Sequence, residues 1–229
     1  MRSYQNINDD NRASVMALLS TLSAPDVTTE DYREAFHNIG RELGRLLGDS
    51  LRNIPEQEVM FAFANEDADW LGRGVMEGGM KQGAKVSVYW NSRKVLLKKG
   101  KRKIEIAPIV KSYEEPIEHC RVLLVVKSII STSCVVKTQL TRLIGHVKPE
   151  RIFVVAPVMF EDSEERLKKE FPKDISMKFT FRTFAVDNEK KGNNIIPGIG
   201  GQVYGRLGLG DGQTKNRYTP ELVIHRMSL

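Results

Sequence analysis

The stretch from residue 121 to residue 146 constrains the fold of this chain most strongly. It begins with the aliphatic run RVLLVV (121–126), which is typical of a strand buried on both faces. The run ends abruptly at Lys127-Ser128, passes through small hydroxylated residues, and continues as a helical pattern over 134–146. A buried strand that leads through a polar loop into a helix is the repeating unit of a parallel α/β sheet.

Strand and helix patterns alternate along most of the chain. The alternation predicts an α/β fold with a mostly parallel central sheet, flanking helices and right-handed crossovers, in a single domain over 1–229. Within it we expect an N-terminal helical region (12–50) and a basic β-hairpin arm (90–110) that turns at Gly100. The expected strands are 58–64, 85–90, 121–126, 151–158 and 177–186, and the expected helices are 12–22, 28–48, 70–83, 134–146 and 163–171.

The composition excludes several classes of protein. No stretch approaches the roughly 18 to 20 apolar residues of a membrane-spanning helix, and the first ten residues lack the apolar core of a signal peptide. Cys120 and Cys134 are too few for a disulfide framework or a zinc site. We therefore expect a cytoplasmic protein with no membrane contact.

The positive charge is concentrated in the expected arm. The chain has a net charge of +6, and seven of the eleven residues from Arg93 to Lys103 are Lys or Arg. Such a cluster attracts phosphates, on a nucleotide or on nucleic acid, although a solvated hairpin would have the same composition. The candidate contacts to pyrophosphate or another polyanion are Arg93, Lys94, Lys98, Lys99 and Lys101.

The loop 127–133 occupies the position where open parallel sheets bind ligands, beyond the carboxyl end of a strand. The hydroxyl groups of Ser131, Thr132 and Ser133, with amides at the start of the next helix, could hold a phosphate. The alternative is a turn whose hydroxyls only cap that helix. A second candidate segment is the glycine-rich stretch 193–218, here called the hood, where main chain could approach a flat ligand closely.

Several segments together resemble the uracil phosphoribosyltransferases, a branch of the type I phosphoribosyltransferases, over most of 18–218. EVMFAFANEDADWLGRGVMEGG (58–79) is placed like the strand, pyrophosphate loop and helix of that family. VLLVVKSIISTSCVV (122–136) is similar to its phosphoribosyl-binding strand and loop, and IIPGIGG and LGLGDG are similar to its pyrimidine-binding segment. The resemblance assigns base binding to Ile196, Gly198, Gly208, Gly210 and Asp211.

Both phosphate-binding loops depart from the family pattern. Lys127 stands where the family has an aspartate that holds the ribose hydroxyls, Ser128 follows it, Thr132 keeps the family's threonine, and Ser133-Cys134 replace two glycines. In the pyrophosphate loop, Asn65-Glu66-Asp67 replaces Arg-Ala-Gly. Two carboxylates should repel a pyrophosphate unless a divalent ion lies between them.

The resemblance and these departures leave different functions open. The first is transfer of ribose 5-phosphate from phosphoribosyl pyrophosphate to a pyrimidine base, in a protein that is expected to form a homodimer and to use Mg²⁺. The second is a catalytically degenerate protein of the same fold that senses a nucleotide, binds nucleic acid or a protein through the arm, or serves as an assembly subunit. A third is cleavage of an N-glycosidic bond by Glu66, Asp67 and Asp69.

Overall fold

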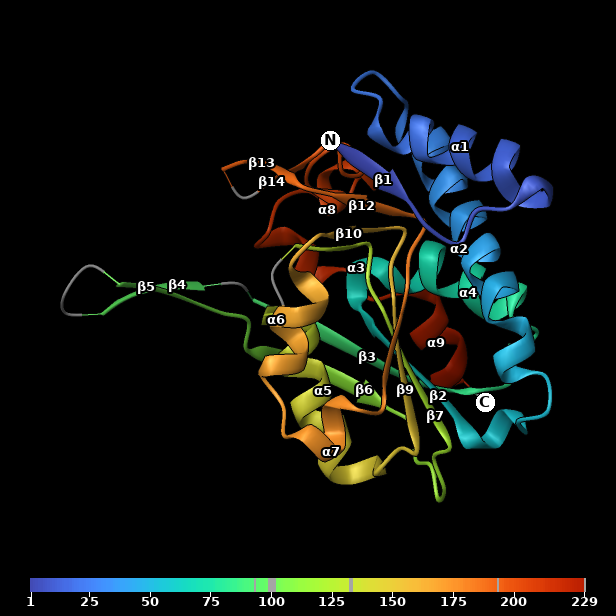
Figure 1. Cartoon of the computed structure of the whole chain (residues 1–229). Helices are drawn as coiled ribbons and strands as arrows, with labels where there is room; N and C mark the ends of the chain where they lie inside the picture. Colours follow the sequence, from blue (N-terminus) through green and yellow to red (C-terminus); the bar gives the residue numbers. More distant parts are fainter. Residues whose placement is uncertain (93, 99–101, 132–133, 193, 229) are drawn as a thin grey trace.

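The core of the protein is a six-stranded sheet with the order β11-β9-β7-β2-β3-β6 (Figure 1). The computed structural model describes residues 1–92, 94–98, 102–131, 134–192 and 194–228. All neighbouring strands run parallel except β6, which is antiparallel to β3. The predicted mostly parallel α/β sheet is therefore confirmed. The strands are β2 (Val59–Ala64), β3 (Lys85–Asn91), β6 (Ile109–Glu114), β7 (Val122–Val126), β9 (Arg151–Val155) and β11 (Phe179–Arg182).

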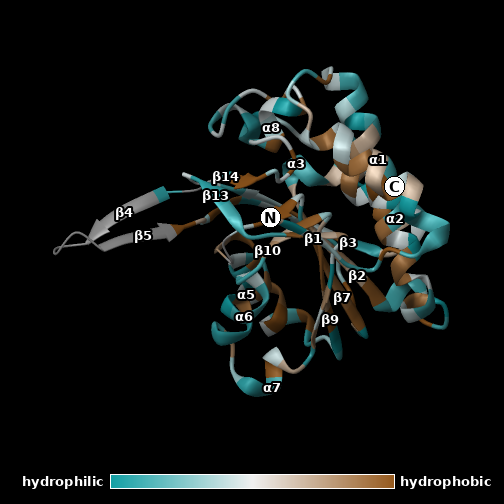
Figure 2. Cartoon of the chain, turned by 45° about the horizontal axis from the view of Figure 1, so that its top comes forward, coloured by the Kyte–Doolittle hydropathy of each residue, from teal (hydrophilic) through white to brown (hydrophobic). Residues whose placement is uncertain are grey.

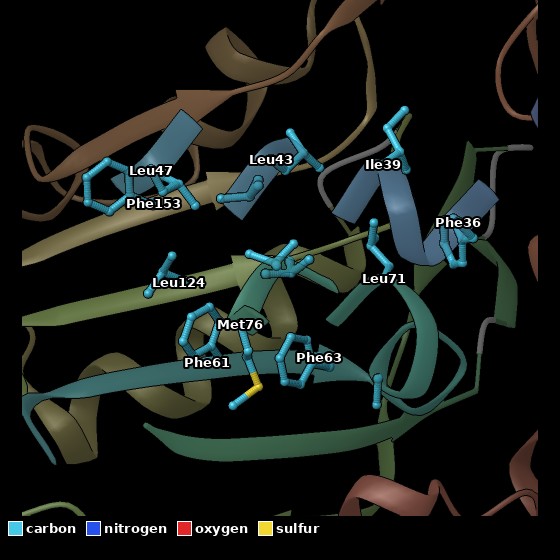
Figure 3. Close-up of a cluster of buried hydrophobic side chains, with 14 of the residues drawn as sticks. Phe36, Ile39, Leu43, Leu47, Phe61, Phe63, Leu71, Met76, Leu124 and Phe153 are labelled. Carbon is cyan, nitrogen blue, oxygen red and sulfur yellow. The ribbon is translucent and has the colours of Figure 1, made fainter. Parts of the chain in front are cut away.

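Helices cover both faces of this sheet, and alternate residues of the central strands serve the two faces. On one face, Phe61, Phe63 and Leu124 join the cluster that contains the apolar side chains of α2 (Figure 3). On the other face, Ala62 and Leu123 join a separate cluster with α5. Figure 2 shows the central strands β2, β7 and β9 as mostly hydrophobic. The first face carries α1 (Asp9–Ser23), α2 (Thr29–Leu51), α4 (Arg73–Gly78) and α9 (Glu221–Met227), and the second carries α5 (Cys134–Val147), α6 (Ser163–Lys169) and α7 (Lys173–Ser176).

Two of the predicted strands are each divided between two sheets. The run 151–158 forms β9 and then β10 (Val158–Phe160), and the run 177–186 forms β11 and then β12 (Ala185–Asp187). Pro157 interrupts the first run because it has no backbone N–H for a ladder, and its carbonyl instead accepts from the amides of Phe184 and Ala185. The second sheet has the order β1-β12-β10-β8, with β1 (Arg2–Tyr4) and β8 (Ile129–Ile130) at its edges.

The expected arm is present as a two-stranded hairpin that projects from the body (Figure 1). Strands β4 (Lys94–Lys98) and β5 (Arg102–Ile106) pair antiparallel, and the predicted turn at Gly100 lies outside the described residues. The hood contains β14 (Asn194–Ile196), which pairs with β13 (Glu189–Lys191), then α8 (Val203–Arg206) and the 3₁₀ helix Thr214–Arg217. None of the helices in the described ranges combines the length and apolar character that crossing a membrane requires.

The chain after β2 does not form the single helix predicted over 70–83. The short helix α3 (Asn65–Asp67) and a wide π-type turn over Ala68–Gly72 come first, and α4 ends at Gly78. Helix α4 instead packs its backbone directly against α2, with glycines on both sides. A Cβ atom on Gly44 would lie 2.3 Å from the carbonyl oxygen of Val75, and one on Gly78 would lie 2.0 Å from that of Arg41. Only glycine permits this approach.

We expect Gly44→Ala to lower the free energy of unfolding by about 1–3 kcal/mol, because the added methyl group must separate two packed backbones. Gly48→Ala is the matched control on the same helix. It meets no atom within 4 Å and should be neutral or stabilise by up to about 1 kcal/mol through its higher helix propensity. Urea unfolding of the three proteins measures both effects, and equal stabilities would refute the close-packing argument.

Candidate functional site

The loop that begins at Asn65 and the loop that begins at Lys127 lie side by side at the carboxyl edge of the central sheet. Strands β2 and β7 are parallel neighbours, with Phe63 paired to Val126. Asn65 begins α3 directly after β2, and Lys127 follows β7 directly. Asn65 and Lys127, 62 positions apart in the sequence, therefore lie at one place, which in open parallel sheets is the edge that binds ligands.

Lys127 binds both acidic side chains of the other loop. Its Nζ lies 2.5 Å from Asp67 Oδ2, 3.2 Å from Glu66 Oε1 and 3.1 Å from Ser128 Oγ. These three oxygens match the three N–H groups of an ammonium ion. Lys127 is 4% exposed and Asp67 is fully buried. The two acidic side chains that were predicted to repel a pyrophosphate thus contact a lysine inside the protein.

A second lysine completes the cluster from the hood. Lys215 Nζ donates to Glu66 Oε2 at 2.7 Å, so each carboxylate oxygen of Glu66 faces a different lysine. The side-chain amide of Asn65 donates to the backbone carbonyl of Lys215 at 2.8 Å and fixes the same hood turn. We call Glu66, Asp67, Lys127 and Lys215 the charge cluster. It brings two lysines and two acidic side chains together at one buried point.

The two carboxyl groups of the charge cluster respond differently to burial. Burial raises the pKa of Glu66, but the charges of Lys127 and Lys215 together outweigh it and lower this pKa to about 2. Burial also raises the pKa of Asp67, Lys127 opposes that change, and the charge of Glu66 reinforces it, so this pKa stays above its usual value. The difference follows from geometry, because Glu66 contacts two lysines and Asp67 contacts one.

Asp69, the third acidic candidate, has a structural role in the described residues. Its carboxylate accepts from the backbone amides of Glu221 at 2.7 Å and Leu222 at 2.8 Å, which are the first two amides of α9. It also accepts from the hydroxyl of Tyr218. Free amides at a helix start are a favourable partner for a carboxylate, so Asp69 anchors the C-terminal helix.

Glu66, Lys127 and Lys215 of the charge cluster form part of the wall of a pocket of about 500 Å³. Its volume lies in the range of small-molecule sites. Ser128 and Ser131 of the predicted phosphoribosyl loop reach it, and so does Lys94 at the base of the arm. Most of the other polar lining residues are uncharged, and both glycine-rich motifs of the hood contribute to the wall. The hood residues that line the pocket are Asn194, Ile195, Ile199, Gly201, Gln202, Val203, Tyr204, Gly212, Gln213 and Lys215.

The five residues assigned to base binding by resemblance shape the hood but do not line this pocket. Gly198, Gly208 and Gly210 have positive φ angles of 58°, 72° and 81°, and they allow the turns that return the chain to the pocket. Asp211 accepts from the backbone amides of residues 213 and 214, so its carboxylate closes a turn. Ile196 is 41% exposed.

Several predicted contacts lie outside the described residues or lack described side chains. Arg93, Lys99, Lys101, Thr132 and Ser133 are outside the described ranges, and Lys98 is placed only as part of the backbone of β4.

The sequence analysis missed Lys215, which joins the cluster from a segment selected only for its glycines. Nothing local to Lys215 in the sequence indicates this role, because the burial of the two acidic side chains is a property of the fold.

We expect Lys127→Met to lower the free energy of unfolding by about 3–5 kcal/mol, because it leaves Asp67 buried without its cation. Adding Asp67→Asn to that variant should recover part of the loss. Lys169→Met is the control, since it removes a lysine from an exposed ion pair with Glu165 and should cost less than about 0.5 kcal/mol. A double variant no more stable than the sum of its single changes would contradict the coupling.

We expect the cost of Glu66→Gln to depend on pH. The pKa of Glu66 is lowered in the folded protein, from 4.5 to about 2. Its ionised form therefore stabilises the fold above about pH 4.5, and this contribution is lost as the pH falls toward 2. The stability difference between the native protein and Glu66→Gln should be largest above pH 5 and should shrink on acidification. Chemical unfolding at a series of pH values measures it, and a constant difference would contradict the lowered pKa.

Comparisons with known proteins inform the fold. No protein-family profile and no curated protein matches the sequence. Among solved structures, the AQ2163 protein from Aquifex aeolicus is similar at a TM-score of 0.65 and 15% identity, over 86% of this chain and 94% of that chain.

Two other matches are weaker. A hypothetical protein from Neisseria gonorrhoeae with bound ppGpp has a TM-score of 0.45 and 12% identity, over 65% of this chain and 80% of its own. The hypoxanthine-guanine phosphoribosyltransferase of L. donovani has a TM-score of 0.43 and 8% identity, over 66% and 77% of the two chains. The α/β architecture, predicted from the sequence, is thus shared over most of its length with the Aquifex protein.

Proposed function

We propose that the protein binds a pyrimidine nucleotide in the pocket beside the charge cluster and does not transfer a phosphoribosyl group. The observation that carries this proposal is the contact of 2.5 Å between Lys127 and Asp67. It joins the two loops that, by resemblance, would hold the ribose and the pyrophosphate of phosphoribosyl pyrophosphate. Of the functions left open by the sequence, the proposal adopts the catalytically degenerate protein that senses a nucleotide. It specifies that nucleotide as a pyrimidine nucleotide.

The chemistry of transfer argues against turnover at this site. Departure of pyrophosphate requires cations that can neutralise it as the bond to the sugar breaks. Both lysines of the charge cluster are already bound to carboxylates, at 2.5 and 2.7 Å. The position where the family has a ribose-binding aspartate holds an ammonium, which cannot accept hydrogen bonds from hydroxyl groups.

The pocket itself supports binding of a nucleotide. Ser128 and Ser131, at the end of β7, offer hydroxyl groups at the usual ligand-binding edge of a parallel sheet. Gln202 and Gln213, whose residues line the pocket, directly follow the two hood motifs that resemble the pyrimidine-binding segment. An amide side chain both donates and accepts, as the edge of a pyrimidine does.

Two measurements on the purified protein test the proposal. With phosphoribosyl pyrophosphate, Mg²⁺ and uracil, we expect no uridine monophosphate and no pyrophosphate above the enzyme-free reaction. Uridine monophosphate at millimolar concentration should raise the melting temperature, because a ligand that binds only the folded state stabilises it. Inorganic phosphate at the same concentration is the control for non-specific ionic effects.

A pair of variants locates the binding. Gln213→Trp places a large side chain at the exposed rim of the pocket and should abolish the shift, whereas Asn53→Trp, at an exposed position away from the pocket, should preserve it. Formation of uridine monophosphate would show that transfer survives, as the enzymatic alternative requires. The absence of both turnover and any thermal shift would show that the pocket is not a nucleotide site.

A further inference from the structure

The resemblance to phosphoribosyltransferases implies Mg²⁺, and the oxygen atoms of the loop 65–67 are the place to test whether it fits. Carboxylate and amide oxygens are the protein ligands that Mg²⁺ prefers. Two such oxygens, Asn65 Oδ1 and Asp67 Oδ1, are buried and have no hydrogen-bond partner within the described residues. Buried oxygens of this kind ordinarily face water or a cation. The loop therefore has the chemistry of a cation site.

The cation that this loop holds is the ammonium of Lys127. It contacts one carboxylate oxygen of Glu66 and one of Asp67, and Lys215 contacts the remaining oxygen of Glu66. Each acidic side chain of the loop thus already contacts a lysine before any ion arrives. In the described ranges, no three His, Cys, Asp or Glu side chains form a group that could hold a metal ion.

A divalent ion does not fit beside this lysine. Mg²⁺ requires near-octahedral oxygen ligands at about 2.0–2.1 Å, and two of the carboxylate oxygens are already directed at Lys127. A divalent charge placed a few ångströms from the buried ammonium would also be repelled by it, in a setting where water screens poorly. The side chain of Lys127 is 5% exposed and is held in the pocket wall by its contacts with Glu66 and Asp67.

We propose that Lys127 is a resident cation that replaces a divalent ion in this site, so that the pocket binds its nucleotide without metal. The inference rests on the proposed function for the identity of the ligand. It deepens that proposal by identifying Lys127 as the residue that determines the metal dependence of binding.

The first test is calorimetric titration of uridine monophosphate in EDTA and in excess MgCl₂. We expect dissociation constants that agree within about twofold, since no divalent ion takes part. Binding tenfold tighter in MgCl₂ would overturn the inference while leaving the proposed function intact. If uridine monophosphate bound in neither buffer, that result would count against the proposed function. The Mn²⁺ experiment described next would still decide whether Lys127 excludes a divalent ion.

The second test uses Mn²⁺ alone, detected by the loss of its free-ion paramagnetic resonance signal. The native protein should leave the signal of Mn²⁺ unchanged at equal concentrations, and Lys127→Ser should reduce it because the carboxylates become available. Lys127→Ser with Asp67→Asn is the matched control and should lose the gain. Since Lys127→Ser is destabilised, its melting temperature is measured with and without Mn²⁺, and we expect a rise with the ion. Binding of Mn²⁺ to the native protein as tightly as to the variant would overturn the inference, as would a variant that neither binds Mn²⁺ nor is stabilised by it.

Discussion

The charge cluster is the interaction on which the functional end of the molecule depends. Moving a charged side chain out of water costs several kilocalories per mole, and only a well-placed opposite charge offsets that cost. Glu66, Asp67, Lys127 and Lys215 are each less than a tenth exposed, so each depends on the others for polar contacts that water would otherwise supply. The cluster joins the ends of β2 and β7 to the hood. The residue type at each of the four positions therefore depends on the residue types at the other three.

This mutual constraint explains why both loops differ together from the phosphoribosyltransferase pattern that the sequence otherwise resembles. An acidic loop at 65–67 beside an aspartate at 127 would bring three carboxylates to one buried point. Lysine at 127 removes that conflict, and the acidic loop in turn gives the buried lysine its partners. The two departures are thus one structural change in which the charges of the two loops are complementary.

The parts of the fold that sequence patterns predicted correctly are those set by local chemistry. Thr28 caps α2 through a hydrogen bond from the amide of Asp31, and the strands β2, β3 and β7 begin and end within about a residue of their expected positions. The divided strands were missed because an apolar run does not reveal that Pro157 redirects the chain into a second sheet. The charge cluster was missed for a different reason. Its residues are distant in the sequence, and only the order of the strands shows that β2 and β7 are neighbours.

The same cluster gives the pocket its chemical character. A phosphoribosyltransferase needs charges that remain available until the substrate arrives, because it must stabilise a pyrophosphate that becomes more negative as it leaves. In this protein the buried charges are bound to each other, and the hood is held in place by Lys215 and by the amide of Asn65. What remains for a ligand is a largely preformed pocket with serine hydroxyls, amide side chains and the rim lysine Lys94. Such a pocket can recognise the shape and hydrogen-bonding pattern of a nucleotide. Its contacts would stabilise a leaving pyrophosphate little more than they stabilise the bound ligand. This arrangement is the physical basis of the proposal that the protein binds a nucleotide without transfer.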